Sequence, residues 1–359
     1  MTKKVKMVDK SRSPKISRTP FRVAVLGCLV LLLVAFTISV SWGAVAIPFT
    51  DVWAILIRKI LHLESMSNLD PTHIDIVWTL RAPRVVLAAM VGSGLSLAGV
   101  AAQAMVRNPL ADPYVLGVSA GASVAAVASI LFGLGAFGLT STSSSAFAGA
   151  VLAMLLVILF GQRRGVIAPL RLILAGVAIG HLLSGITSFL VLQADDAQQV
   201  FGVLFWLEGS LARSNWNFLL LPVVAILASW VTLFADGHKL NALLVGDETA
   251  SSLGVNVNYL RGRLLIITAL LTAVMVSLSG IIGFVGLVVP HIARLLVGSD
   301  HRRVIPVAAI FGAAFLILAD AIARLLLAPI EIPVGIVTGI FGAPFFLWLL
   351  WRAENLVRV

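Results

Sequence analysis

The sequence predicts an all-α protein that crosses a membrane about ten times. Of its 359 residues, 60% are hydrophobic and only 12% are charged, and the mean hydropathy is +1.05. A soluble domain of this size cannot hide so much apolar surface in one core. Uncharged stretches of about 20 residues, the length of a helix that spans the hydrocarbon layer, recur along the chain. Composition, hydropathy and this recurrence together indicate a polytopic membrane protein.

The ten predicted spans can be placed in order. We expect them at residues 23–50, 85–106, two within 113–162, 172–194, 214–235, two within 264–293, 304–327 and 332–351. The stretch GLGAFGLTSTSSS at 133–145 supplies the turn inside the first double segment. Gly280 and Gly283 divide the other one into a full helix and a short one. Asp320 and Arg324 are the only charges inside the ninth span.

The distribution of positive charge predicts the orientation in the membrane. Residues 1–22 hold eight Lys or Arg and one acid, and we expect this basic tail to be cytoplasmic. With ten spans in the single transmembrane domain, 23–359, the C-terminus is cytoplasmic too. The basic corners then lie on the same side, at Arg107, 163–171, Lys239, 261–263 and 302–303. The net charge of +10 therefore reflects topology, and no nucleic-acid partner is expected.

The N-terminal apolar segment also resembles a signal peptide, since Ala44-Val45-Ala46 follows it. Its apolar run of about 20 residues is longer than the usual apolar core of such peptides. An uncleaved first helix is therefore favoured. We place the chain in the bacterial cytoplasmic membrane as a multi-pass protein.

The stretch RNPLADPYVLGVSAGAS at 107–123 predicts a stiff corner between two spans. Pro109 disfavours helical geometry at Asn108, so the preceding helix should end near Arg107. Asp112 and Pro113 are a typical N-cap and first-turn pair, which predicts a helix that starts at Pro113.

The chain lacks the residues of a self-contained transport engine. It has no Gly-Lys pair and therefore no phosphate-binding P-loop. Its six histidines show no metal-ligand spacing. An ion-coupled carrier would bury several carboxylates, whereas the spans hold one, Asp320, with Arg324 one turn later as its partner. Neither a secondary transporter nor an intramembrane enzyme is favoured, and we expect energy to come from another subunit.

The segment LNALLVGDETASSLG at 240–254 predicts a cytoplasmic surface helix. Apolar residues at 243, 244, 250 and 253 give it an apolar face, and Gly254 ends it. Such a helix either docks in a groove on a partner or packs on its own bundle. The pattern alone leaves both alternatives open.

Three stretches together resemble one family. They are RAPRVVLAAMVGSGLSLAGVAAQAMVRNPLADPYVLGVSAGAS, IIGFVGLVVPHIARLLVGSDHRRVIPVAAIFGAAFLILADAIAR and EIPVGIVTGIFGAPFFLWLL. The resemblance is to the FecCD/BtuC-type permease subunits of type II ABC importers for ferric siderophores, haem and cobalamin. It implies ten helices in each of two permease copies, identical or similar, around a central path. It also implies two ATPase subunits that hold ATP and Mg, and a periplasmic or lipid-anchored binding protein. No cofactor is expected on this chain itself.

The resemblance assigns roles to residues of this chain. The segment 246–254 is similar to the family's coupling helix, which favours docking on the ATPase over packing on the bundle. Its implied contact residues are Gly246, Asp247, Glu248, Ala250, Leu253 and Gly254. Arg81, Arg84 and Arg324 are similar to positions that pair with acidic residues of the binding protein. Structural alternatives are a pair of Arg324 with Asp320, and anchoring of a helix end by Arg81 and Arg84.

The resemblance also implies a cytoplasmic gate and a class of ligand. Asn108 and Leu110, with Pro169 and Leu170, are similar to loops that narrow the path at its inner end. His181 is a candidate for the wall of the path, although packing is the simpler role for it. The expected ligand is an iron chelate, either a ferric siderophore or haem, with cobalamin as the alternative.

Overall fold

The computed structural model describes residues 19–357 except 44, 64–68, 134–141 and 164–165. These residues are helical apart from turns, loops and two short antiparallel strands, β1 (Gln162–Arg163) and β2 (Val166–Ile167). The all-α prediction is confirmed. Most of the predicted tail, 1–22, lies outside the described residues.

The helices follow the predicted ladder, with additions at the connections. They are α1 (Phe21–Ser41), α2 (Phe49–Ile60), α3 (Pro71–Asp75), η1 (Ile76–Arg81), α4 (Ala82–Val106), η2 (Pro113–Leu116), α5 (Val118–Phe132), α6 (Thr142–Gly161), α7 (Pro169–Val191), α8 (Ala197–Leu207), η4 (Trp216–Phe218), α9 (Leu220–Ala235), α10 (Gly237–Val245), α11 (Asp247–Ser252), α12 (Val257–Ser279), α13 (Val285–Val297), α14 (His301–Leu325) and α15 (Val334–Val357).

Ten of these helical segments correspond to the ten predicted spans. In the described part of the chain, seven segments are long and apolar enough to cross a membrane. The shorter apolar helices α5, α13 and α15 account for the remaining three predicted spans. A fourth short apolar helix, α8, was not predicted.

The predicted ends of the first two spans were wrong. The first span ends at Ser41 instead of continuing to residue 50, and α2 begins after Pro48 as a separate helix. The second begins at Pro71, well before residue 85, as one continuous helical segment, 71–106. Asp70 caps it by accepting a hydrogen bond of 2.8 Å from the Thr72 amide. This contact holds the pKa of Asp70 below its usual range.

Helix α4 forms the centre of the molecule. It packs against α9, α12, α13 and α14. In the most apolar 18 residues of the segment 71–106, 78% of the residues are buried, compared with 28% in α1 and 22% in α7. Glycines allow two of these close contacts, because a Cβ on Gly92 or Gly99 would overlap the carbonyl of Gly312 or Gly286. The outer helices therefore leave wide apolar faces toward lipid or a second protein.

Helix α13 and the non-helical residues just before it lie inside the bundle. Helix α13 has 13 residues, or about 20 Å, too short to cross the hydrocarbon layer. The non-helical residues before it are held by Tyr114, whose hydroxyl donates to the Ile282 carbonyl at 3.0 Å and accepts from the Ile282 amide at 3.2 Å. Irregular backbone at this depth needs such partners.

The predicted corner at 107–123 is confirmed with one change. Helix α4 ends at Val106, and Asp112 accepts a hydrogen bond of 2.8 Å from the Tyr114 amide. The helix that starts at Pro113 is one turn of 3₁₀ helix, however, and α5 begins only at Val118. Gly117, at φ +71°, separates the two.

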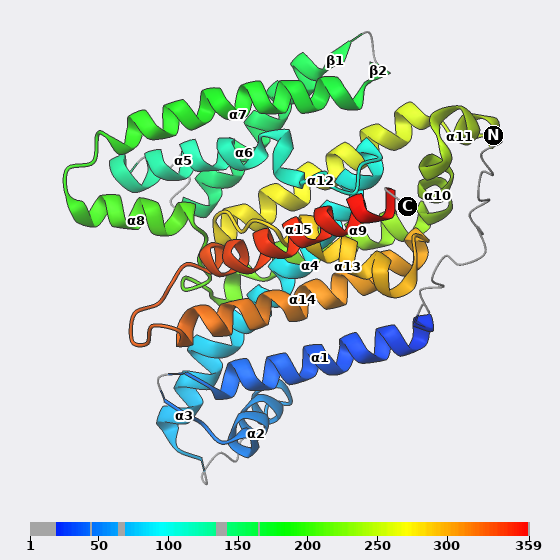
Figure 1. Ribbon diagram of the computed structural model, residues 1–359. Helices are drawn as coiled ribbons and strands as arrows, with labels where there is room; N and C mark the ends of the chain where they lie inside the picture. Colours follow the sequence, from blue (N-terminus) through cyan, green and yellow to red (C-terminus); the bar gives the residue numbers. More distant parts are fainter. Residues whose placement is uncertain (1–18, 44, 64–68, 134–141, 164–165, 358–359) are drawn as a thin grey trace, which may run out of the picture.

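The single surface helix predicted at 240–254 is in fact two helices. Gly246 lies between α10 and α11 with φ +142° and ψ 161°, which is not helical. Figure 1 shows α10 and α11 at the same end of the molecule as the start of α1 and the last turns of α15. By the predicted topology this is the cytoplasmic end, called the inner end below, and α2, α3 and α8 lie at the opposite, outer end.

Candidate functional site

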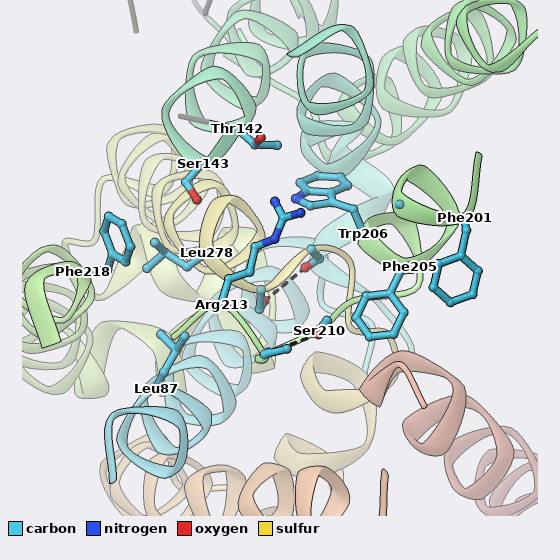
Figure 2. A pocket seen from close by; sticks show the side chains of 14 residues that line it. Leu87, Thr142, Ser143, Phe201, Phe205, Trp206, Ser210, Arg213, Phe218 and Leu278 are labelled. Atoms are coloured by element: carbon cyan, nitrogen blue, oxygen red, sulfur yellow. Dashed lines mark hydrogen bonds between the residues drawn. The ribbon is translucent and has the colours of Figure 1, made fainter. Parts of the chain in front are cut away.

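A cavity of about 410 Å³ lies between the start of α6, α8 and the end of α12. Its walls are mostly aromatic and apolar, and they include Phe201, Phe205 and Trp206. Figure 2 shows the Arg213 side chain extending into this space toward Trp206, with Ser143 nearby. A largely apolar hollow with a few converging polar groups is typical of small-molecule sites. No sequence pattern predicts this set of residues, because they meet only in the folded chain.

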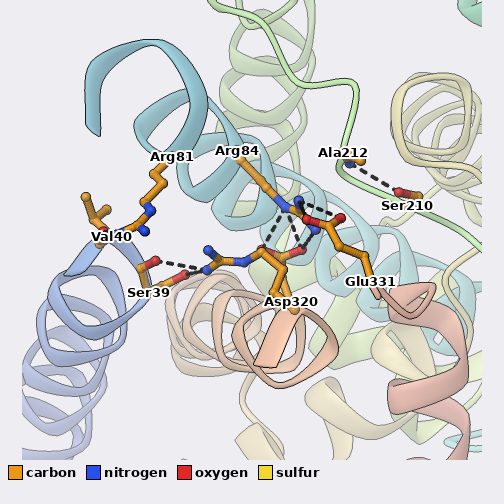
Figure 3. Close-up of polar contacts among 9 residues, drawn as sticks. Ser39, Val40, Arg81, Arg84, Ser210, Ala212, Asp320 and Glu331 are labelled. Atoms are coloured by element: carbon orange, nitrogen blue, oxygen red, sulfur yellow. Dashed lines mark hydrogen bonds and ion pairs between the residues drawn. The ribbon is translucent and has the colours of Figure 1, made fainter. Parts of the chain in front are cut away.

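Three arginines and two acidic residues form a cluster near the outer ends of α1, α4 and α14, buried except for Glu331 (Figure 3). Arg84 donates through Nε to Asp320 at 3.0 Å and through Nη1 to both oxygens of Glu331 at 2.9 Å. Arg324 donates through Nε to Asp320 at 3.1 Å, and through Nη2 to the Ser39 hydroxyl at 2.6 Å. The predicted Asp320–Arg324 pair is confirmed, and Asp320 has Arg84 as a second partner.

Arg81 in the same region binds the end of α1. Its Nη1 donates to the carbonyls of Val40 and Ser41 at 2.8 and 2.9 Å, and its Nη2 donates to Val45 at 2.5 Å. A guanidinium group at a helix C-terminus satisfies free carbonyls and opposes the negative end of the helix dipole. Arg81 therefore caps the end of α1, and the predicted alternative, anchoring of a helix end at the interface, stays a prediction.

Burial distinguishes the members of this cluster. Arg81 and Arg84 are 8% exposed, and Asp320 is fully buried. Glu331, on the loop before α15, is the accessible member, with 39% of its side chain exposed. The three arginines that were predicted to dock a binding protein thus have internal partners in the single chain. Their role in docking stays a prediction.

The coupling segment is tied to the bundle through Asp247. Its carboxylate accepts two hydrogen-bonded contacts of 2.9 Å from Arg261, a buried residue of α12. Arg107, directly after α4, is a second and looser partner, with Nη1 at 3.6 Å from Asp247 Oδ1. One carboxylate therefore connects α11 both to α12 and to the corner that carries Asn108. The sequence analysis found Asp247 but neither of its partners.

The apolar residues of this segment divide between two surfaces. Leu243 and Ala250 are buried against the bundle, whereas Leu244, Val245 and Leu253 are exposed. Packing on the bundle is thus present in this segment, and docking on a partner stays a prediction for its exposed residues. Glu248 is also exposed, and Gly254 follows α11 at φ +80°. The exposed side chains of Leu244, Val245 and Leu253 are available to a partner.

The predicted gate residues lie at two corners of the inner end. Asn108 closes a tight turn by accepting a hydrogen bond of 2.9 Å from the Leu110 amide. Pro169 is the first residue of α7. The side chains of Leu110 and Leu170 are exposed in the single chain, which leaves them free to meet groups of a second copy. The gate itself stays a prediction.

His181 lies on the exposed side of α7, beside a cavity of about 310 Å³. Tyr114 and Ser184 line the same cavity. His181 is therefore not packed in the core of the single chain. Its contact with a transported ligand stays a prediction.

Comparisons with known proteins agree with this architecture. A model of the FecCD transport family matches residues 31–352. The hemin transport system permease HmuU of Yersinia pestis is 40% identical over 92% of this chain and 96% of its own. The cobalamin import permease BtuC of Halobacterium salinarum is 42% identical over 78% of this chain and 74% of its own. A solved structure described as an inward-facing metal-chelate type ABC transporter is 32% identical, with a TM-score of 0.79 over 92% of this chain and 99% of that one.

Proposed function

The chain belongs to the FecCD transport family, and from that premise we propose that it carries an iron chelate, a ferric siderophore or haem, into the cell. It is a membrane-embedded permease of a type II ABC importer, a class that works with an ATPase and a binding protein. It is a multi-pass protein of the cytoplasmic membrane. The observation that carries the choice of an iron chelate is the 40% identity to a hemin permease over nearly the whole of both chains.

Cobalamin is the runner-up ligand, because the Halobacterium relative is similar over about three quarters of each chain at 42% identity. An ion-coupled mechanism has less support. Its coupling carboxylate would have to exchange a proton or cation with the path, whereas Asp320 is fully buried between Arg84 and Arg324.

Two copies of the chain, or one copy and a similar permease, enclose the path in the proposed assembly. The poorly buried faces of α7 and α15 support this arrangement, because they are apolar and uncovered in the single chain. Two ATPase subunits bind ATP and Mg below the permeases. The exposed Leu244, Val245 and Leu253 at the inner end form the docking surface for them.

Movement of the ATPase subunits would displace α11, and Asp247 would transmit the displacement to Arg107 and the corner at Asn108 and Leu110. The direct contact between Arg107 and Asp247 supports this route. The binding protein, periplasmic or lipid-anchored, would dock at the outer end. In the single chain Glu331 forms an ion pair with Arg84 there. Because Glu331 is partly exposed, a carboxylate of the binding protein could take its place beside Arg84.

An uptake experiment tests the ligand. Labelled haem, a ferric hydroxamate siderophore and cyanocobalamin are supplied one at a time to cells that lack this permease, with and without the gene restored. Restored uptake of haem or the siderophore supports the proposal. Restored uptake of cyanocobalamin alone establishes the runner-up, and no restored uptake of any of the three contradicts both.

A further inference from the structure

A third cavity lies at the inner end, between the end of α4, α10 and the corner that joins α13 to α14. Its volume is about 360 Å³. The polar residues that line it are Gln103, Arg107, Asn108, Arg294, Ser299 and His301. Two of them are permanently charged cations, and none of the described residues that line the cavity is a carboxylate.

Arg294 is a half-buried cation without an opposing charge. Its Nη2 donates to Gln103 Oε1, and the Gln103 amide in turn donates to the Gly286 and Leu287 carbonyls at 3.3 and 3.2 Å. Among the described residues, Arg294 makes no ion pair. Arginine keeps its proton in proteins, so burial against a neutral amide leaves its charge uncompensated and costly.

Arg107 is only partly compensated. It lies 3.6 Å from Asp247, and 41% of its side chain is exposed. The same carboxylate is held at 2.9 Å by two nitrogens of Arg261. Because Asp247 is shared with this closer partner, the guanidinium group of Arg107 keeps donors free toward the cavity.

The other nearby acid is occupied elsewhere. Asp300 accepts hydrogen bonds from Asn241 at 2.7 Å and from the Arg302 amide at 3.0 Å, and it lies 3.7 Å from Arg303. Burial raises the pKa of Asp300, but these hydrogen bonds lower it further, so the pKa is below its usual range. The carboxylate of Asp300 caps and offsets the N-terminus of α14, so the positive charge at the cavity comes from Arg107 and Arg294.

We propose that this cavity binds a phosphate-type oxyanion, free or on a lipid headgroup, between Arg107 and Arg294. Planar guanidinium groups match the oxygens of phosphate with paired N–H donors. Asn108 and Ser299 add neutral donors to the same wall. An anion at this site competes with Asp247 for Arg107, so its occupancy is linked to the contact between the gate corner and the coupling segment.

Binding of radiolabelled inorganic phosphate to the purified, delipidated full-length chain in neutral detergent tests this site. Equilibrium dialysis should find one site per chain, with affinity about tenfold lower in Arg294→Gln. Asp247→Asn should bind several-fold more tightly, because Arg107 loses its competing carboxylate. Arg303 is an exposed cation on the same side of the molecule. The Arg303→Gln variant should bind phosphate as the unaltered chain does.

Short-chain phosphatidic acid in place of phosphate distinguishes the two sources. Binding of the lipid alone, with the same dependence on Arg294 and Asp247, assigns the site to a headgroup. The proposal is overturned if neither ligand binds, or if binding is equal in the unaltered chain, Arg294→Gln and Asp247→Asn. Should Arg294→Gln fail to fold, Arg107→Gln and Asp247→Asn still give opposite expected changes. The assay involves no transport, so its outcome is independent of the proposed function.

Discussion

The two ends of the permease use the same side chain, arginine, with different numbers of compensating carboxylates. At the outer end, Arg84 and Arg324 share the fully buried Asp320, and Arg84 also holds Glu331. At the inner end, Arg107 and Arg261 share one carboxylate, and Arg294 has only a neutral amide. The arginines of the outer cluster all have close partners within the chain, whereas at the inner end Arg294 has no carboxylate partner and Arg107 only a distant one. The outer end has two carboxylates for three arginines, with Arg81 held by backbone carbonyls, whereas the inner end has one carboxylate for three. The inner arginines are therefore more open to an external anion.

The largest expected effect comes from Asp320→Asn. It leaves Arg84 and Arg324 buried without their shared carboxylate, and removal of one partner of a buried pair costs about 3–5 kcal/mol. Thermal unfolding in detergent, followed by tryptophan fluorescence, should show the loss. Arg294→Gln is the matched inner variant and should cost far less, because it strands no carboxylate. Equal losses in the two variants would show that the clusters do not differ in charge balance.

Next in size is the effect of Asp247→Asn on coupling. The amide loses the ion pairs with both Arg107 and Arg261, so displacement of α11 is no longer passed to the gate corner. In proteoliposomes with the ATPase and binding protein, transport per ATP hydrolysed should fall several-fold. Asp247→Glu keeps the charge and should retain most of the coupling. An unchanged ratio in Asp247→Asn would place the coupling contact elsewhere.

A smaller effect is expected from Leu110→Ala at the predicted gate. Truncation of the exposed leucine widens the constriction, and passive efflux of entrapped cyanocobalamin from sealed vesicles should rise a few-fold. Leu33→Ala on α1, an outer helix, removes a leucine that is 55% exposed, compared with 42% for Leu110, and efflux from those vesicles should stay at the basal rate. Identical efflux in both variants would argue against a gate at Leu110.

Glu331→Gln should have the smallest effect on stability. Its side chain is 39% exposed, so loss of its charge should cost less than about 1 kcal/mol of unfolding free energy. The same change frees Arg84 and should tighten binding of the binding protein. A loss in stability as large as that of Asp320→Asn would mean that the outer cluster acts as one inseparable unit.

The fold was predictable from hydropathy because each span must satisfy its backbone within one helix. The connections were less predictable. Helix α8 has 11 residues, fewer than a span needs, so no length criterion detects it. The break at Gly246 was read as part of one helix, because an apolar pattern on both sides of a glycine does not reveal its backbone angles.

The sites were predictable only in part, because their contacts join distant segments. Asp320 and Arg324 lie one turn apart in one helix, and that pair was found. Arg84 lies 236 residues from Asp320, and no pattern in a single sequence links them. Arg107 and Arg261 likewise reach Asp247 through the tertiary fold alone.

The contact between Tyr114 and Ile282 has a consequence for electrical insulation. A permease must pass its cargo while the membrane keeps its voltage and its proton gradient. Bare amide and carbonyl groups inside the hydrocarbon layer would attract water, and a file of water molecules conducts protons. The hydroxyl of Tyr114 forms hydrogen bonds with both the amide and the carbonyl of Ile282. Water therefore has no free backbone group of Ile282 to bind. Phenylalanine at position 114 would keep the ring but leave the amide and the carbonyl of Ile282 without these two hydrogen bonds.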